Sequence, residues 1–599
     1  MISTQKLCTD WDLSQLYLSF HDPSFTNDLA QVEADFSQIK AMLLQENKIT
    51  PSYLLKCLQR MDEANLLFSK VSSYVNLTLL VDSSHSIALR FSDRISALEA
   101  ASQQCITLLQ HKISTLNNIE DLISNCVDLQ PYAFMLRESY KLSKHRAPMD
   151  IEDVIFQMQL TGGKAWQALR DSLDGAARVS ITLNGEEKTL PLSAVRAMAS
   201  SPCRETRQAA YQAELASYKS YEVPMAACLN AIKGEALTTI QLRGYKSVLD
   251  RMLDINKMDQ QTLNAMMDSI EEYLPAFHRY LKAKSKLLKH KNGLPWYDLL
   301  APVGKTVRTF TYEEAYHFLT DIFTAFDKDM GSFIRHAFEN RWIDALPKEG
   351  KIGGALCADL PSLRQNRIFV NFGGSYSHVL TLAHELGHAF HFRCLDDIPL
   401  VMRDAPTPIC ETASIFNETI VQEQLLKSAS PEEGIFILEA RLSEATQTVV
   451  DIYSRFLFEK EVFERRKSHS LSADELCEIM LDAQRAAYGD SLDPDYLHPY
   501  MWMCKVHYYI PEFHYYNFPY TFGLLFAKGL YRRYKDNPES FMEEYRDLLK
   551  STCSDYMVGI AARANIDIHS RSFWDSSLDM IVEDINAFIG LCEKNKYSL

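Results

Sequence analysis

The chain has 599 residues, 47% of them hydrophobic, and a formal net charge of −16. The hydrophobic fraction is ordinary for a folded protein and argues against disorder, and the acidic balance argues against a nucleic-acid-binding protein, which would carry a basic surface. Because a single hydrophobic core stops growing well below this length, the sequence predicts two or more lobes.

The segment at the start, MISTQKLCTDWDLSQLYLSF, has no basic stretch followed by an apolar one, so it does not resemble a secretory signal. No stretch approaches the roughly 18 apolar residues that a membrane span requires. The 13 cysteines are odd in number and include no C-x-x-C pair, a pattern that suits reduced thiols. We therefore expect a cytoplasmic protein that binds neither membranes nor nucleic acids.

Apolar residues recur at spacings of three and four along much of the chain, a periodicity that predicts helices. The clearest segments are 86–116, 263–287 and 451–463. Glycine and proline are sparse, at 21 residues each. The sequence therefore predicts a mainly α fold of long helices joined by short loops.

Two places interrupt the helical pattern. Residues 179–192, VSITLNGEEKTLPL, predict a β-hairpin in which an Asn-Gly pair forms the tight turn. Residues 353–357 and 367–372 predict two short strands, which belong either to an ordinary small sheet or to an exposed edge that binds an extended peptide. A break near residue 200 predicts the boundary between an N-terminal helical domain, 1–200, and a domain with all the chemical motifs, 201–599.

The segment 377–391, SHVLTLAHELGHAFH, carries the strongest chemical signal. His384 and His388 are four residues apart, so on a helix both imidazoles lie on one face and can bind one tetrahedral metal ion. Glu385 lies beside them, where it can contact a water at the metal and act as a general base. His391 is about 10 Å further along the helix than His384, so we place it in the wall of the cleft and not among the ligands.

A third ligand is expected from a second helix, 408–418, with the sequence PICETASIFNE. Glu411 lies in its first turns, and the 27 positions after His384 leave room for a helix, a loop and a returning helix. Glu418 lies two turns later on the same face, where it could accept a hydrogen bond from the outer nitrogen of a ligand histidine. The predicted metal ligands are therefore His384, His388 and Glu411.

Three segments together resemble the thimet-oligopeptidase-like zinc peptidases of family M3, and specifically the bacterial oligoendopeptidase F branch. They are HELGHAFH at 384–391, ETASIFNE at 411–418 and HYYIPEFHYYNFPYTFG at 507–523. The resemblance implies a two-lobed helical enzyme with a deep channel and a small β-sheet near the active site. It also implies one Zn²⁺ per chain and an endopeptidase that hydrolyses internal bonds of short unfolded peptides.

In that family, a histidine and several tyrosines of the C-terminal segment contact the substrate and the developing oxyanion. The resemblance implies that His507, Tyr516 and Tyr520 take these catalytic roles here. Three other residues compete for them: Tyr508, His514 and Tyr515.

Two other interpretations stay open. A helical zinc carboxypeptidase, which trims C-terminal residues, has a similar motif but needs a site for the free carboxylate, usually an arginine, and none is evident near the motifs. A non-catalytic peptide-binding protein with a structural metal would need a fourth protein ligand, for which Cys394 and Cys410 are the candidates. An intact Glu385 argues against the second interpretation. The sequence does not indicate the oligomeric state or the cleavage preference.

Overall fold

The computed structural model describes residues 7–45, 48–304 and 308–594, and the fold is mainly α, as predicted. The helices before the hairpin are α1 Pro23–Gln45, α2 Pro51–Val81, α3 Ser86–Ser114, α4 Ile119–Ser124, α5 Ala133–Ser143, α6 Met149–Thr161 and α7 Gly163–Ala176. Those between the hairpin and the metal motif are α8 Leu192–Ala197, α9 Arg204–Leu242, α10 Val248–Ile255, α11 Gln260–Leu287, α12 Tyr312–Phe326 and α13 Lys328–Glu339.

The C-terminal helices begin with the one that carries the metal motif. They are α14 Tyr376–Cys394, α15 Thr407–Cys410, α16 Thr412–Ser428, α17 Pro431–Thr446, α18 Ile452–Arg466, α19 Ala473–Tyr488, α20 Met501–Cys504, α21 Phe518–Asp536, α22 Pro538–Ser551, α23 Met557–Arg563 and α24 Arg571–Lys594. Among the described residues, no helix combines the length and the apolar character needed to cross a bilayer.

The hairpin lies where the sequence predicts it. Strand β1, Arg178–Leu183, pairs antiparallel with β2, Glu186–Pro191. Asn184 and Gly185 connect them with φ angles of 54° and 81°, the left-handed conformation that a tight hairpin turn requires.

A second, three-stranded sheet lies next to the metal motif. Its order is β3-β5-β4, so β4, Leu356–Leu360, is an edge strand that pairs antiparallel with β5, Gln365–Phe369, while β3 is Ile343–Asp344. Strand β4 begins three residues later than predicted. Gly354 has a φ of 100°, which is incompatible with an extended strand at that position.

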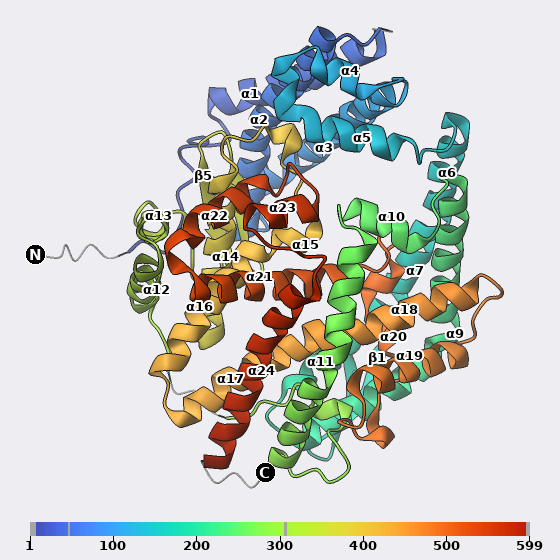
Figure 1. Ribbon diagram of the computed structural model, residues 1–599, viewed down its shortest axis with the longest axis vertical. Coiled ribbons are helices and arrows are strands. Elements are labelled where there is room, and N and C mark those ends of the chain that lie inside the picture. The colour runs from blue at the N-terminus through green and yellow to red at the C-terminus, as the bar shows by residue number, and fades with distance from the viewer. Residues whose placement is uncertain (1–6, 46–47, 305–307, 595–599) are drawn as a thin grey trace, which may run out of the picture.

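Three hydrophobic clusters make up the core. One is formed by α1–α5, which occupy the top of Figure 1 in blue, with a few side chains from β4 and β5. Another joins the hairpin to α9, α18, α19 and α20. The largest contains α10–α17 and α21–α24. The hairpin packs with α9 and not with α1–α5. The domain boundary near residue 200 and the deep channel both stay predictions.

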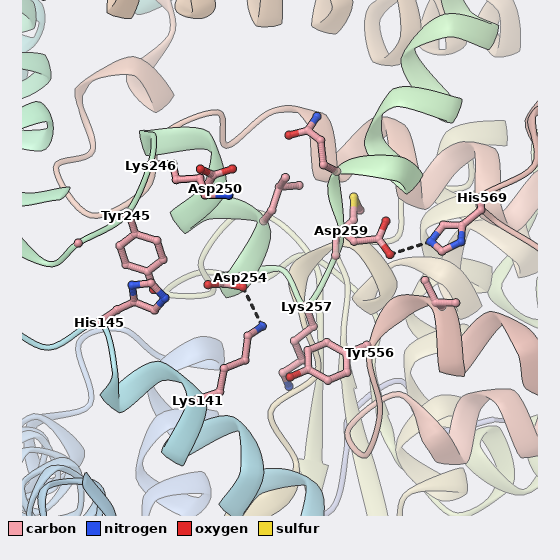
Figure 2. A pocket seen from close by; sticks show the side chains of 15 residues that line it. Lys141, His145, Tyr245, Lys246, Asp250, Asp254, Lys257, Asp259, Tyr556 and His569 are labelled. Carbon is pink, nitrogen blue, oxygen red and sulfur yellow. Dashed lines mark hydrogen bonds and ion pairs between the residues drawn. The ribbon is translucent and has the colours of Figure 1, made fainter. Parts of the chain in front are cut away.

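A cavity of about 600 Å³ separates α5 from α10 and the start of α11. Figure 2 shows two polar contacts in its wall: an ion pair of Lys141 with Asp254, at 2.8 Å, and a hydrogen bond between His569 Nε2 and Asp259, at 2.7 Å. The first pair fastens the N-terminal helices to the largest cluster. None of the residues that line this cavity comes from α14, α15 or α16, so it is separate from the metal motif.

Candidate metal centre

Helix α14 carries the H-E-x-x-H segment, and a capping box fixes its first residue. The Ser375 hydroxyl accepts a hydrogen bond from the N–H of His378, and the His378 ring accepts one from the N–H of Ser375. The apolar face of the helix is fully buried and consists of Val379, Leu382, Leu386 and Phe390. This packing fixes the rotation of the helix and leaves His384 and His388 on a half-buried face.

Gly387 allows α14 and α16 to approach closely. A Cβ on Gly387 would lie 2.5 Å from the carbonyl oxygen of Ala413 and 2.6 Å from the Cα of Ser414. The amide of Asn417 adds a hydrogen bond of 3.1 Å to the carbonyl oxygen of Ala383. This contact brings Glu411 opposite the two histidines.

The predicted second helix is interrupted at Glu411. Helix α15 ends at Cys410, and α16 begins at Thr412. Glu411 itself has φ −89° and ψ 2°, a conformation between helix and strand that tightens the turn. The expectation of one continuous helix from 408 to 418 is therefore wrong, although Glu411 still faces α14.

Three ligand atoms converge on one point. The Nε2 atoms of His384 and His388 are 3.1 Å apart, and Glu411 Oε2 lies 3.1 Å from the first and 3.3 Å from the second. Around a tetrahedral zinc with bonds of about 2.0–2.2 Å, ligand atoms are separated by roughly 3.3–3.6 Å. The donor set therefore fits one zinc ion with little movement. No other His, Cys, Asp or Glu of the described ranges joins this group.

The electrostatics of the site favour a bound cation. Although burial opposes the charged form, hydrogen bonds with Glu411 and Glu418 raise the pKa of His384 to about 10. Burial also works against the charged form of Glu411, yet its contacts with His384 and His388 hold its pKa far below the usual range. Positive charge is thus stabilised where the three ligand atoms meet, and a divalent ion would supply it.

Glu418 orients one of the histidines. Its Oε1 lies 2.5 Å from His384 Nδ1, so this ring nitrogen donates to the carboxylate and Nε2 is the nitrogen that would bind a metal. We expect Glu418→Gln to weaken zinc binding by about 10–100-fold, measured by competition with a chromogenic chelator. Glu432→Gln, at an exposed position on α17, is the control and should leave the affinity unchanged. Equal affinity in both variants would contradict an orienting role.

We predict that Gly387→Ala separates α14 from α16. The added methyl group overlaps backbone atoms and should lower the free energy of unfolding by about 1–3 kcal/mol. It should also reduce the zinc content, because Glu411 moves away from the histidines. Denaturant unfolding and metal analysis measure the two effects. Gly590→Ala, in helix α24 with nothing within 4 Å of the added Cβ, is the matched control: it should keep the zinc content and raise the free energy of unfolding by about 0.5–1 kcal/mol, because alanine favours a helix interior.

Three residues considered from the sequence lie outside the group. His391 is only 4% exposed and its Nε2 lies 2.8 Å from Thr552 Oγ1, so it belongs to the packing between helices and not to a cleft wall. The Cys410 thiol donates to the carbonyl oxygen of Ala405. Neither Cys410 nor Cys394 joins the three ligand atoms. The fourth ligand of a closed structural site is therefore missing among the described residues.

The C-terminal segment places three side chains together at the start of α21. The ring centroids of His507 and Tyr516 are 5.0 Å apart, and Tyr520 lies 5.7 Å from Tyr516 and 6.2 Å from His507. Helix α21 reaches the metal group, because a Cβ on Gly523 would lie 3.8 Å from Glu411 Cβ. Burial together with Tyr516 raises the pKa of Tyr520, so Tyr520 keeps its proton and can donate it in a hydrogen bond.

The competing residues of this segment are enclosed in the core. Tyr508 is 0% exposed and Tyr515 is 6% exposed, whereas Tyr520 is 38% exposed. His514 is also buried, with its Nδ1 3.2 Å from the Lys233 ammonium. The geometry therefore favours His507, Tyr516 and Tyr520 over the other three for contact with a substrate.

Sequence reasoning missed one contact of the group. The Ser414 hydroxyl donates a hydrogen bond of 2.8 Å to Glu411 Oε2 and so helps to fix the carboxylate. The spacing of three residues from Glu411 was the available signal, because such pairs are neighbours on a helix.

Known proteins match most of the chain in sequence. The sequence model described as Peptidase family M3 matches residues 197–580. Group B oligopeptidase PepB of Streptococcus agalactiae is 24% identical over 538 residues, 88% of each chain. The chromosomal oligoendopeptidase F of Lactococcus lactis subsp. cremoris is 25% identical over 413 residues, 68% of each chain.

Solved structures share the fold. A protein from Chlamydophila abortus superposes with a TM-score of 0.87 at 21% identity, over 97% of this chain and 98% of that one. Oligoendopeptidase-F from Enterococcus faecium superposes with a TM-score of 0.69 at 18% identity, over 95% and 99%. The match to the family model covers well over half of the sequence and includes all three motifs. The chain therefore belongs to peptidase family M3.

Proposed function

We propose that this chain is a zinc-dependent endopeptidase that hydrolyses internal bonds of short unfolded peptides. In this proposal His384, His388 and Glu411 hold one zinc ion, and Glu385 is the general base. The observation that carries it is the convergence of three ligand atoms beside a buried glutamate. Relatives named oligopeptidase and oligoendopeptidase F support this substrate class.

The zinc ion and Glu385 would have different roles in hydrolysis. A zinc ion held by these ligands supplies Lewis-acid chemistry, since it lowers the pKa of a water from 15.7 toward roughly 7 and polarises a carbonyl group. Burial raises the pKa of Glu385, which brings it closer to neutral pH and makes it a better proton acceptor. Glu385 would take the proton of the attacking water and pass it to the departing amine.

The edge strand offers a place for the peptide backbone. Strand β4 has one edge without a partner strand among the described residues, and it packs next to α14. Cys357 on β4 is close enough to Glu385 that burial and this carboxylate together raise the pKa of the thiol. An extended peptide that pairs with β4 would therefore run past Glu385.

Tyr520 is the proposed hydrogen-bond donor to the developing oxyanion. We expect Tyr520→Phe to lower kcat by roughly 10²–10³-fold with little change in KM, because the donor acts mainly in the transition state. Steady-state kinetics on a quenched fluorescent peptide measures both constants. Tyr515→Phe removes a hydroxyl from a buried neighbour and should leave both constants unchanged. If Tyr515→Phe lowered kcat and Tyr520→Phe did not, Tyr515 would be the donor instead.

A peptide with both termini blocked tests the proposed reaction. An endopeptidase cuts it internally, and mass spectrometry then shows two fragments that disappear with a chelator. A carboxypeptidase leaves it intact. The structure offers little support for the second activity, since Arg455, near His507, already pairs with Asp451 and Asn517. An intact blocked peptide beside a trimmed free one would overturn the proposal.

We also propose a cytoplasmic location. All 13 cysteines carry free thiols, as in proteins of reducing compartments. Zinc is preferred to other divalent ions because two imidazoles and one carboxylate are typical ligands of catalytic zinc.

A further inference from the structure

A second group of metal-binding side chains lies outside the peptidase site. Glu214 comes from α9, His498 from the loop before α20, and Cys504 from the last turn of α20. One ligand atom of each lies within 4.8 Å of the other two. No motif spacing reveals this group, because nearly 300 positions separate Glu214 from the other two residues.

Glu214 reaches each of the other two residues through a different carboxylate oxygen, and both distances are close to those between ligands of one ion. Cys504 Sγ lies 3.5 Å from Glu214 Oε1, and His498 Nε2 lies 3.7 Å from Glu214 Oε2. Around zinc, with bonds of about 2.0–2.3 Å, such atoms are separated by roughly 3.3–3.7 Å. The Tyr218 hydroxyl lies 3.1 Å from the sulfur and 3.0 Å from Glu214 Oε1, where a fourth donor would stand.

His498 is the observation that calls for a ligand. It is 1% exposed, and neither of its ring nitrogens has a hydrogen-bond partner in the part of the chain that the structure describes. Buried imidazoles normally satisfy both nitrogens. The rings of Tyr211, Tyr218 and Trp296 surround it and hold it beside a cavity of about 170 Å³. This volume accommodates an ion with a water.

The nearby arginines already contact carboxylates. Arg196 lies 3.2 Å from Glu214 Oε1 and 3.3 Å from Asp174, and it also contacts the Tyr218 hydroxyl, so an ion would replace the guanidinium at Glu214. Arg207, in the cavity wall, is bound to Asp298. The Glu214 carboxylate and a Cys504 thiolate would then balance the charge of a divalent ion.

We propose that Glu214, His498 and Cys504 form a second zinc site, distinct from the peptidase centre. A thiolate, an imidazole and a carboxylate favour zinc over the hard ions Mg²⁺ and Ca²⁺. Binding forms a zinc–sulfur bond and releases the thiol proton to solvent. The ion would fasten α9 to α20, three residues before His507, and so stabilise the segment that carries His507.

Metal stoichiometry of the full-length protein tests the second site. After loading with zinc and dialysis, plasma mass spectrometry should find two zinc ions per wild-type chain. One ion should remain in Cys504→Ala, and one in the His384→Ala/His388→Ala double variant. The control Cys477→Ala removes another partly buried thiol of the same cluster and should keep both ions. A single zinc ion in the wild-type chain would overturn the proposal.

Cobalt identifies the ligand directly. The peptidase ligands include no cysteine, so a thiolate-to-cobalt charge-transfer band in the His384→Ala/His388→Ala double variant can come only from another site. Adding Cys504→Ser should abolish it, and adding Cys477→Ser should not. If Cys504 variants fail to fold, His498→Gln should remove the second zinc ion instead. Absence of the band from the folded double variant refutes the second site without affecting the proposed peptidase function.

Discussion

Glu385→Gln should lower kcat by about 10²–10⁴-fold, the contribution of a general base, while the protein keeps its zinc. Glutamine has nearly the volume of glutamate, so the buried position beside His384 and His388 stays filled. The amide cannot accept a proton from the attacking water. Because Glu385 is not among the three converging ligand atoms, metal content should stay at the wild-type level. Kinetics on a blocked peptide and metal analysis of the same sample measure the two quantities.

Glu385→Asp sharpens this test. It keeps the carboxylate but withdraws it by one methylene group, so kcat should fall less than in Glu385→Gln. Equal melting temperatures of the three proteins would exclude misfolding as the cause. If Glu385→Gln retained wild-type turnover at full zinc content, another residue would have to be the base.

The sequence was most informative where chemistry and local geometry coincide. The spacing of His384 and His388 needs only one helix turn, so it was readable without a structure. The family, the mainly α fold and the metalloendopeptidase class were predicted from the sequence and are confirmed. The hairpin was readable because Asn184-Gly185 determines its turn locally.

Predictions that depend on contacts between distant segments were weaker. The break of the helix at Glu411 lies beside the close contact of α14 with α16 at Gly387, which joins segments far apart in the sequence. The burial of His391 against Thr552 depends on a residue 161 positions away, at the end of α22. Local patterns carry no information on such contacts, which is why His391 was misplaced. For the same reason, no local sequence pattern links His498 and Cys504 to Glu214.

Removal of the third ligand should have the other large effect. We expect Glu411→Ala to weaken zinc binding by more than the roughly 100-fold that loss of an outer partner can cause, and to abolish peptide hydrolysis at ordinary zinc concentrations. The reason is that Glu411 Oε2 contacts both His384 Nε2 and His388 Nε2, at 3.1 and 3.3 Å. Without it, the converging ligand atoms include no carboxylate oxygen to offset the charge of a divalent ion.

Thermal unfolding separates this effect from general damage by Glu411→Ala. A ligand at 100 times its Kd stabilises the folded state by about 2.7 kcal/mol, so a chelator should lower the Tm of the wild-type protein. Cys504→Ala should accompany Glu411→Ala in this experiment, so that the proposed second site does not mask the result. In the Glu411→Ala/Cys504→Ala double variant, zinc or a chelator should no longer change the Tm. In Cys504→Ala alone, both should still change it. A wild-type response in the double variant would show that Glu411 is not a ligand.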